Sequence, residues 1–150
     1  MIGEIPAWIK KAEPIVYLRI SNKEQAGSDM GKKPEDMDTL KSQLKIVKQG
    51  LKDRGFKMPK SENIFYEVVS GGELPENRPI WNQAIQKALG MKKRTYIAVK
   101  EPRRWARDQT WGEWAYAPLK RAEIPLYATM LGLLTSTILE PRSNEHAFWS

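Results

Sequence analysis

Short runs of aliphatic and β-branched residues alternate along this chain with amphipathic segments of helical period. The runs that we expect to form strands are Pro14–Ile20, Ile64–Val69, Thr95–Val99 and Ile124–Thr129. Strands that are separated by helices form parallel sheets, which are covered on both faces. The pattern therefore predicts an α/β protein of three layers, in which helices cover both faces of a central, mostly parallel sheet of four or five strands.

Two helices are predicted between these strands. The first opens with the acidic turn Pro34–Asp38 and ends at Arg54 and Gly55. Its apolar face comprises Leu40, Leu44, Val47 and Leu51. The second begins at Pro79, because the first position of a helix tolerates proline. Its core face comprises Ile80, Ala84, Ala88 and Leu89.

The connector between the third and fourth strands, Asp108–Ala122, is expected to be helical in part. Pro118 lies in it and lacks a backbone donor, so we expect either a kink or a shorter helix that ends near Tyr116. Its Trp111 and Trp114 are three residues apart and would share one helix face, which favours packing on the sheet over stacking on bases.

The composition excludes several kinds of chemistry. The chain has 150 residues, no Cys and a single His, His146, which excludes disulfides, thiolate nucleophiles and most zinc sites. Met1–Pro14 lacks the pattern of a secretion signal. The longest uncharged run, Ile124–Leu139, has 16 residues, which is too short to span a bilayer, and we expect it to form buried strands. We therefore expect a cytoplasmic domain with no membrane partner.

The positive charge of the chain is concentrated in one segment. The 25 Lys and Arg residues exceed the 18 Asp and Glu residues and give a net charge of +7, which favours a polyanionic partner. Met91–Arg107 alone holds seven basic residues against one acid, Glu101. Such a run is often only a solvated face. Here it overlaps the third predicted strand and continues past its carboxyl end, where ligands bind in parallel sheets.

Chemically active side chains follow three of the predicted strands. They are Arg19 and Ser21 at the end of the first, Glu67, Ser70 and Arg78 around the end of the second, and Arg104 and Arg107 after the third. A serine among arginines suits attack on a phosphodiester, because guanidinium groups bind phosphate and stabilise the negative charge that develops in the transition state. Nearby positive charge also favours the serine alkoxide, and this chemistry requires no metal.

Four segments in order along the chain carry a more specific pattern. They are Tyr17–Ser21 with Gln25 four residues later, Leu40–Leu44 with Gln43, Phe65–Gly71 followed by Arg78 and Pro79, and Val99–Asp108 with Arg104 and Arg107. In this order they resemble the motifs of the serine recombinase catalytic domain, the resolvase and invertase group that includes the large phage integrases. The resemblance extends from about Ile15 to at least Tyr127.

The resemblance implies site-specific DNA strand exchange that needs no cofactor. Ser21 would be the nucleophile and form a 5′-phosphoserine intermediate, while Arg19, Arg104 and Arg107 would hold the scissile phosphate. Arg78 would assist them. The remaining candidates would orient these groups and are Gln25, Gln43, Glu67 and Ser70.

The resemblance also implies partners and a setting. The partner would be double-stranded DNA, and the full-length protein would self-associate into a dimer and a synaptic tetramer, with a monomer as the alternative for this fragment. It would integrate, excise, invert or resolve mobile DNA in a prokaryotic cell, or be encoded by a phage or another mobile element.

The sequence departs from the family pattern at three places. Glu67 stands where the family usually has Asp, and Arg103 replaces the acid that precedes the first arginine of the last motif. The loop Ala26–Lys33 is longer than in small resolvases. We expect an N-terminal extension at 1–14, the catalytic domain at 15–140 and the start of a long C-terminal helix at 141–150, truncated before any DNA-binding domain.

Other interpretations remain open. The same fold could serve as a catalytically inactive DNA-binding or regulatory domain, which Arg103 and the short C-terminal segment favour. A metal-dependent nuclease would need clustered carboxylates, and only Glu67 and Glu101 are near the predicted strand ends. Arg78 alone could be a surface residue paired with an acid of the preceding loop, Glu73 or Glu76. Trp8 and Ile9 could pack on the core or on a partner.

Overall fold

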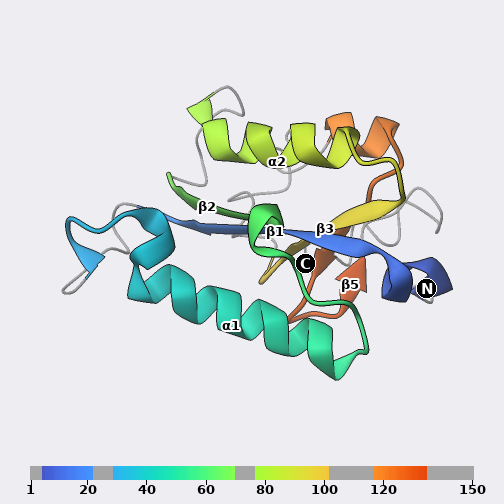
Figure 1. Ribbon diagram of the computed structural model, residues 1–150, viewed down its shortest axis with the longest axis horizontal. Coiled ribbons are helices and arrows are strands. Elements are labelled where there is room, and N and C mark those ends of the chain that lie inside the picture. The colour runs from blue at the N-terminus through green and yellow to red at the C-terminus, as the bar shows by residue number, and fades with distance from the viewer. Residues whose placement is uncertain (1–4, 22–28, 70–76, 102–116, 135–150) are drawn as a thin grey trace.

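The computed structural model of the chain describes residues 5–21, 29–69, 77–101 and 117–134 (Figure 1). The helices whose bounds lie within these ranges are η1 (Ala7–Lys11), η4 (Pro34–Asp36), α1 (Asp38–Asp53), η5 (Ser61–Asn63) and α2 (Pro79–Leu89), where η marks a 3₁₀-helix. Its strands are β1 (Glu13–Ile20), β2 (Ile64–Val68), β3 (Thr95–Val99), β4 (Leu126–Ala128) and β5 (Leu133–Leu134). The four strands predicted from the sequence are thus present, with ends that differ by two residues or fewer.

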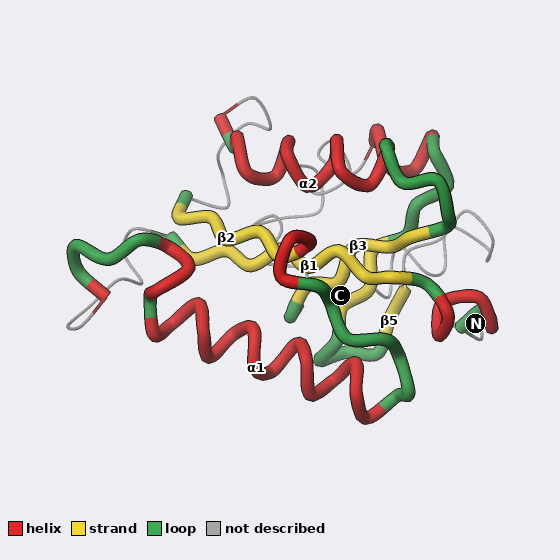
Figure 2. The backbone as a smooth tube through the Cα atoms, in the orientation of Figure 1, coloured by secondary structure: helices red, strands yellow, loops and turns green. Residues whose placement is uncertain are grey.

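The strands form one sheet in the order β2-β1-β3-β4-β5. The first four are parallel, and the short β5 pairs antiparallel with β4. Helices α1 and α2 lie on opposite sides of this sheet (Figures 1 and 2). The predicted α/β architecture, a mostly parallel sheet between helical layers, is therefore confirmed.

Strand β1 runs through the middle of the core and contributes to both sides of it. Successive side chains of a strand point to opposite faces. Ile15 and Tyr17 accordingly pack in the cluster under α2, whereas Val16, Leu18 and Ile20 pack in the cluster under α1. Because both faces are covered, every residue from Pro14 to Ile20 is buried. This alternation places Arg19 on the same face as Tyr17.

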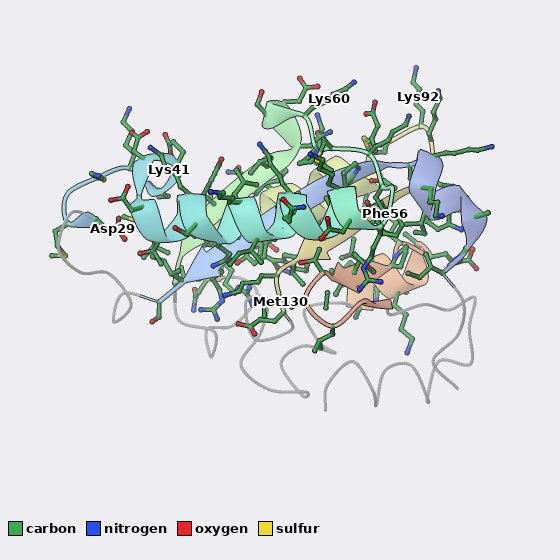
Figure 3. All side chains as sticks on the ribbon, turned by 90° about the horizontal axis from the view of Figure 1, so that it is seen from below. Asp29, Lys41, Phe56, Lys60, Lys92 and Met130 are labelled. Carbon is green, nitrogen blue, oxygen red and sulfur yellow. The ribbon has the colours of Figure 1, made fainter. Side chains whose placement is uncertain are left out.

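Helix α1 begins later than the sequence pattern predicts. Pro34–Asp36 forms a 3₁₀ turn, and the α-helix starts at Asp38. The carboxylate of Asp29 accepts hydrogen bonds from the backbone N–H groups of Asp38 and Thr39 and from the Thr39 hydroxyl. Asp29 lies beside the first turn of α1 in Figure 3. It satisfies donors that have no partner within the helix, and so fixes where α1 begins.

The buried face of α2 differs from the predicted one. Its buried residues are Trp81, Ala84, Ile85 and Ala88, which are spaced at helical period. Leu89 was predicted in the core but is 43% exposed. The prediction was wrong there because Trp81 sets the buried stripe, and Leu89 at the end of the helix lies outside it.

The described residues after β3 correct one expectation. Residues 117–121, which include Pro118, are helical, whereas the preceding part of the predicted connector helix lies outside the described residues. Pro118 lacks a donor but keeps its carbonyl, which accepts a hydrogen bond from the N–H of Ala122 at 3.3 Å. Of the run at 124–139, the described part forms β4 and β5 with a turn between them, where Met130 and Leu131 are 57% and 48% exposed.

The residues that precede β1 pack on the same core. Ile9 of η1 is fully buried in the cluster under α1, and Trp8 is partly buried against it. The guanidinium carbon of Arg94 lies 4.3 Å from the centroid of the Trp8 ring, within the range of a cation–π contact. Within the ranges that the structure describes, no helix is long and apolar enough to cross a membrane.

Candidate functional site

The carboxyl ends of β1 and β2 bring three candidate residues to one edge of the sheet. Arg19 lies opposite Glu67 in the parallel register, and Ser21 follows the last residue of β1. The N–H of Val69 donates to the carbonyl of Ile20 at 3.0 Å, so the two chains remain paired beyond the strands. Ser21 itself is partly exposed.

Arg19 is held at this edge from two sides. Its side chain is buried, and Nη1 donates to the carbonyl of Val69 at 2.8 Å. Its backbone N–H donates to Oε1 of Gln43, and its carbonyl accepts from Nε2 of Gln43, both at 3.2 Å. The sequence predicts both residues in one site, and the structure brings them into contact.

The pairing of the strands explains why the backbone of Arg19 contacts Gln43. The pairing of β1 with β3 ends at Val16, so the later residues of β1 have no β3 neighbour in register. The carbonyl of Ile20 faces β2, and backbone groups of successive residues point to opposite sides. The polar groups of Arg19 therefore face the unpaired side, where the amide of Gln43 replaces a strand. This explains why a buried polar residue interrupts the apolar face of α1.

A second cluster joins Glu67, Tyr17 and Arg78. The phenol of Tyr17 donates to Oε1 of Glu67 at 2.6 Å and accepts from Nη2 of Arg78 at 2.8 Å. Nε of Arg78 lies 3.9 Å from Oε1 of Glu67, and the two side chains are 1% and 2% exposed. Burial raises the pKa of the Tyr17 phenol well above its ordinary value, with Arg78 acting in the opposite direction. Tyr17 therefore remains a neutral bridge between the two charges.

Glu67 also holds the start of α2. Its Oε2 accepts from the N–H of Ile80 at 2.7 Å, and its Oε1 accepts from the N–H of Trp81 at 3.2 Å. A negative charge is favoured at a helix N-terminus, where these backbone donors have no partner within the helix. One carboxylate thus connects the end of β2 to the helix that follows it.

Arg78 is an interior residue. Its guanidinium carbon lies 5.4 Å from the ring centroid of Tyr17 and 5.8 Å from that of Trp81. The alternative of an exposed arginine paired with Glu73 or Glu76 is therefore wrong, because the guanidinium is enclosed by two rings and the Glu67 carboxylate. The sequence motif predicts Arg78 as a site residue, but no local sequence pattern predicts that its side chain is buried.

The structure describes five of the nine predicted site residues, which form two groups. Arg19 and Gln43 contact one another beside Ser21, and Glu67 contacts Arg78. Gln25, Ser70, Arg104 and Arg107 lie outside the described residues.

Tyr17 was missed as a site residue, although it stands two positions before Arg19, which places it on the same face of β1. In the described ranges, no three His, Cys, Asp or Glu side chains form a group that could hold a metal ion.

Comparison with known proteins supports the fold. The sequence matches no protein-family model and no curated protein. Among solved structures, the chain resembles the crystal structure of the N-terminal catalytic domain of TP901-1 integrase, with a TM-score of 0.64. The likeness covers 90% of each chain at 13% sequence identity. At this identity, the likeness shows a shared fold.

Proposed function

We propose that this chain is the catalytic domain of a site-specific DNA recombinase that uses Ser21 as its nucleophile. The observation that carries the proposal is the position of Ser21, partly exposed at the carboxyl end of β1 and two residues after a buried, doubly anchored arginine. The fold shared with an integrase catalytic domain supports the same function. The ordered motifs of the sequence give independent support, because they resemble those of serine recombinases.

The proposed reaction exchanges one phosphodiester for another. Oγ of Ser21 gives up its proton and attacks a backbone phosphorus, the bond from phosphorus to the 3′-oxygen breaks, and the 3′-oxygen takes up a proton. The products are a 5′-phosphoserine ester and a free 3′-hydroxyl. After the ends exchange, a 3′-hydroxyl attacks the ester, and Ser21 is released with its proton restored. The number of phosphate ester bonds is unchanged, so strand exchange needs no energy source or cofactor.

Arginines would supply the electrostatic stabilisation of the proposed reaction. Arg19, Arg104 and Arg107 would bind the scissile phosphate and stabilise its added charge in the transition state. Arg19 would do so from a fixed position, because Gln43 and Val69 hold its backbone and side chain. Gln25 and Ser70 would orient these groups.

The buried cluster would act as a support in this proposal. Arg78 and Glu67 contact each other and Tyr17 beneath the strand ends. We therefore assign Glu67, Arg78 and Tyr17 as positioning residues that fix the end of β2 relative to α2. The partner would be double-stranded DNA, bound by a dimer that pairs into a synaptic tetramer, and the setting would be mobile DNA in a prokaryotic cell or phage.

A covalent trapping experiment tests the proposal. The full gene product is incubated with EDTA and duplex DNA carrying the junctions of the element that encodes it, and the products are separated on a denaturing gel. With a 3′ label, cleavage should give a slow band that protease removes, because the protein stays on the 5′-phosphate. With a 5′ label, the fragment should migrate as free DNA with a 3′-hydroxyl.

Two serine variants make the test specific. Ser21→Ala should abolish the adduct while DNA binding persists, and Ser42→Ala on the exposed side of α1 should leave it unchanged. DNA binding by the wild-type protein without an adduct would favour the inactive DNA-binding or regulatory domain. Cleavage that occurs only with added divalent metal would favour a nuclease.

A further inference from the structure

Helix α1 presents a row of four lysines to solvent. They are Lys41, Lys45, Lys48 and Lys52, and all four are exposed. At 100° per residue, their positions fall within an arc of roughly 60° around the helix. At 1.5 Å per residue, the row is about 16 Å long. Figure 3 looks onto this helix, with Lys41 labelled near its first turns.

This lysine row carries unbalanced positive charge. Each member has another lysine three or four positions away, and such like-charged neighbours destabilise a helix. No ion pair joins any of the four to a carboxylate among the described residues. The acids of α1 are Asp38, paired with Lys32, and Asp53, which accepts a hydrogen bond from Gln49. The row therefore lowers the stability of the helix that carries it unless an anion binds.

The row borders a shallow hollow of about 290 Å³ that also includes Leu44 and Met58. Lysines thus make up most of the lining of the hollow, and the methylene groups of these lysines border it together with the two apolar side chains. Lysine is depleted at protein interfaces, whereas it is a common partner of nucleic-acid phosphates. Counting both strands, a duplex has a phosphate about every 1.7 Å along its axis, so a length of about 16 Å offers more phosphates than the row has lysines.

We propose that the lysine row of α1 is a second DNA-binding surface, which holds the backbone of a duplex without regard to sequence. It goes beyond the proposed function, because binding here requires neither Ser21 nor the carboxyl ends of the strands. A duplex on this surface would lie along α1, on the outer side of the helix that supplies Gln43 to the strand-end site.

The salt dependence of binding tests this proposal. The full chain is titrated against a fluorescent duplex of scrambled sequence, about 30 base pairs long, at several salt concentrations. The variant replaces the four lysines with Gln, which keeps good helix propensity. The control replaces Lys10, Lys11, Lys57 and Lys87 with Gln, since these are exposed, lie outside both α1 and the basic segment Met91–Arg107, and carry the same total charge.

The expected result is a difference between these two variants. The salt slope is the slope of the logarithm of the binding constant against the logarithm of the salt concentration, and each phosphate contact contributes about 0.9 to its magnitude. The α1 variant should therefore lose about 3 to 4 in salt slope and at least about tenfold in affinity. The control should lose less than half as much. Equal losses would overturn the proposal, because only net charge would then matter. Binding of polyglutamate but not duplex would also overturn it and indicate an acidic protein partner.

Ser21→Ala separates this proposal from the recombinase function. The variant should bind the scrambled duplex with the wild-type salt slope, whether or not the wild type forms a covalent adduct. A serine-dependent salt slope would contradict a separate surface. Circular dichroism compares the helix content of each lysine variant with that of the wild type. Where the helix content is unchanged, a loss of binding is assigned to the missing charge.

Discussion

The side-chain amide of Gln43 pairs with the backbone of Arg19 in both directions. It accepts from the Arg19 N–H and donates to the Arg19 carbonyl, each at 3.2 Å. Both residues are buried, with Gln43 3% exposed. A side chain of α1 thus completes the hydrogen bonding of β1 one residue before the end of the strand, where β3 no longer pairs. We therefore expect the position of Arg19 to depend on this contact.

Gln43→Leu is expected to destabilise the domain by about 2 to 6 kcal/mol, because it leaves two backbone groups of Arg19 unpaired and each buried unpaired group costs about 1–3 kcal/mol. Leucine retains the bulk but neither hydrogen-bonding group. Urea denaturation measures the change, and Gln49→Leu on the exposed side of the same helix should cost about 0.5 kcal/mol or less. Similar losses in the two variants would show that the Arg19 backbone does not depend on Gln43.

Tyr17→Phe is expected to cost about 1–3 kcal/mol, because it removes the hydroxyl that bridges Arg78 and Glu67 inside the core. Tyr127→Phe is the matched control. The Tyr127 hydroxyl is also buried but has no hydrogen-bond partner among the described residues, so its removal should be neutral or stabilising. Chemical denaturation compares the two variants, and equal costs would argue against a bridging role for Tyr17.

Glu67→Gln is expected to cost about 3–5 kcal/mol, because it leaves the buried charge of Arg78 without its partner. The double variant Glu67→Gln with Arg78→Met should be less destabilised than the sum of its single variants, since it removes both charges. A double-mutant cycle by urea denaturation measures this coupling. Additive costs would show that the two side chains stabilise the fold independently.

The sequence predicted the strands well because local patterns determine them. Thr95–Val99 is a strand with the predicted bounds, and it is a run of five buried residues between polar ones. Arg19, Ser21 and Glu67 were predicted near one edge because the carboxyl ends of parallel strands meet there. These predictions require only short-range periodicity and one topological rule.

The remaining features depend on contacts between distant residues. The hydroxyl of Tyr17 meets Arg78 across 61 positions of sequence, so no local pattern predicts that Arg78 is buried. The nearby acids Glu73 and Glu76 instead offered a surface partner. The start of α1 was misplaced for the same reason, since Asp29 reaches it from nine positions upstream of Asp38.

Asp29→Asn is expected to lower the melting temperature at neutral pH by roughly 2 to 4 °C, because the amide is a poorer acceptor for the donors at the start of α1. The hydrogen bond from the Thr39 hydroxyl is the main cause that lowers the pKa of Asp29 below its ordinary value of 3.8, and the backbone N–H groups of Asp38 and Thr39 add to it. A lowered pKa means that the folded state favours the carboxylate. Its stabilisation is present above pH 3.8 and is lost as pH falls through the lower, folded-state value.

The difference in melting temperature between wild type and Asp29→Asn should therefore be constant near neutral pH and shrink below pH 3.8. Calorimetry from neutral to strongly acid pH measures it. Glu62→Gln, which removes an exposed carboxylate of η5, controls for net charge and should show no such convergence. A gap between wild type and Asp29→Asn that persists at the lowest pH would mean that Asp29 holds α1 through its shape and not its charge.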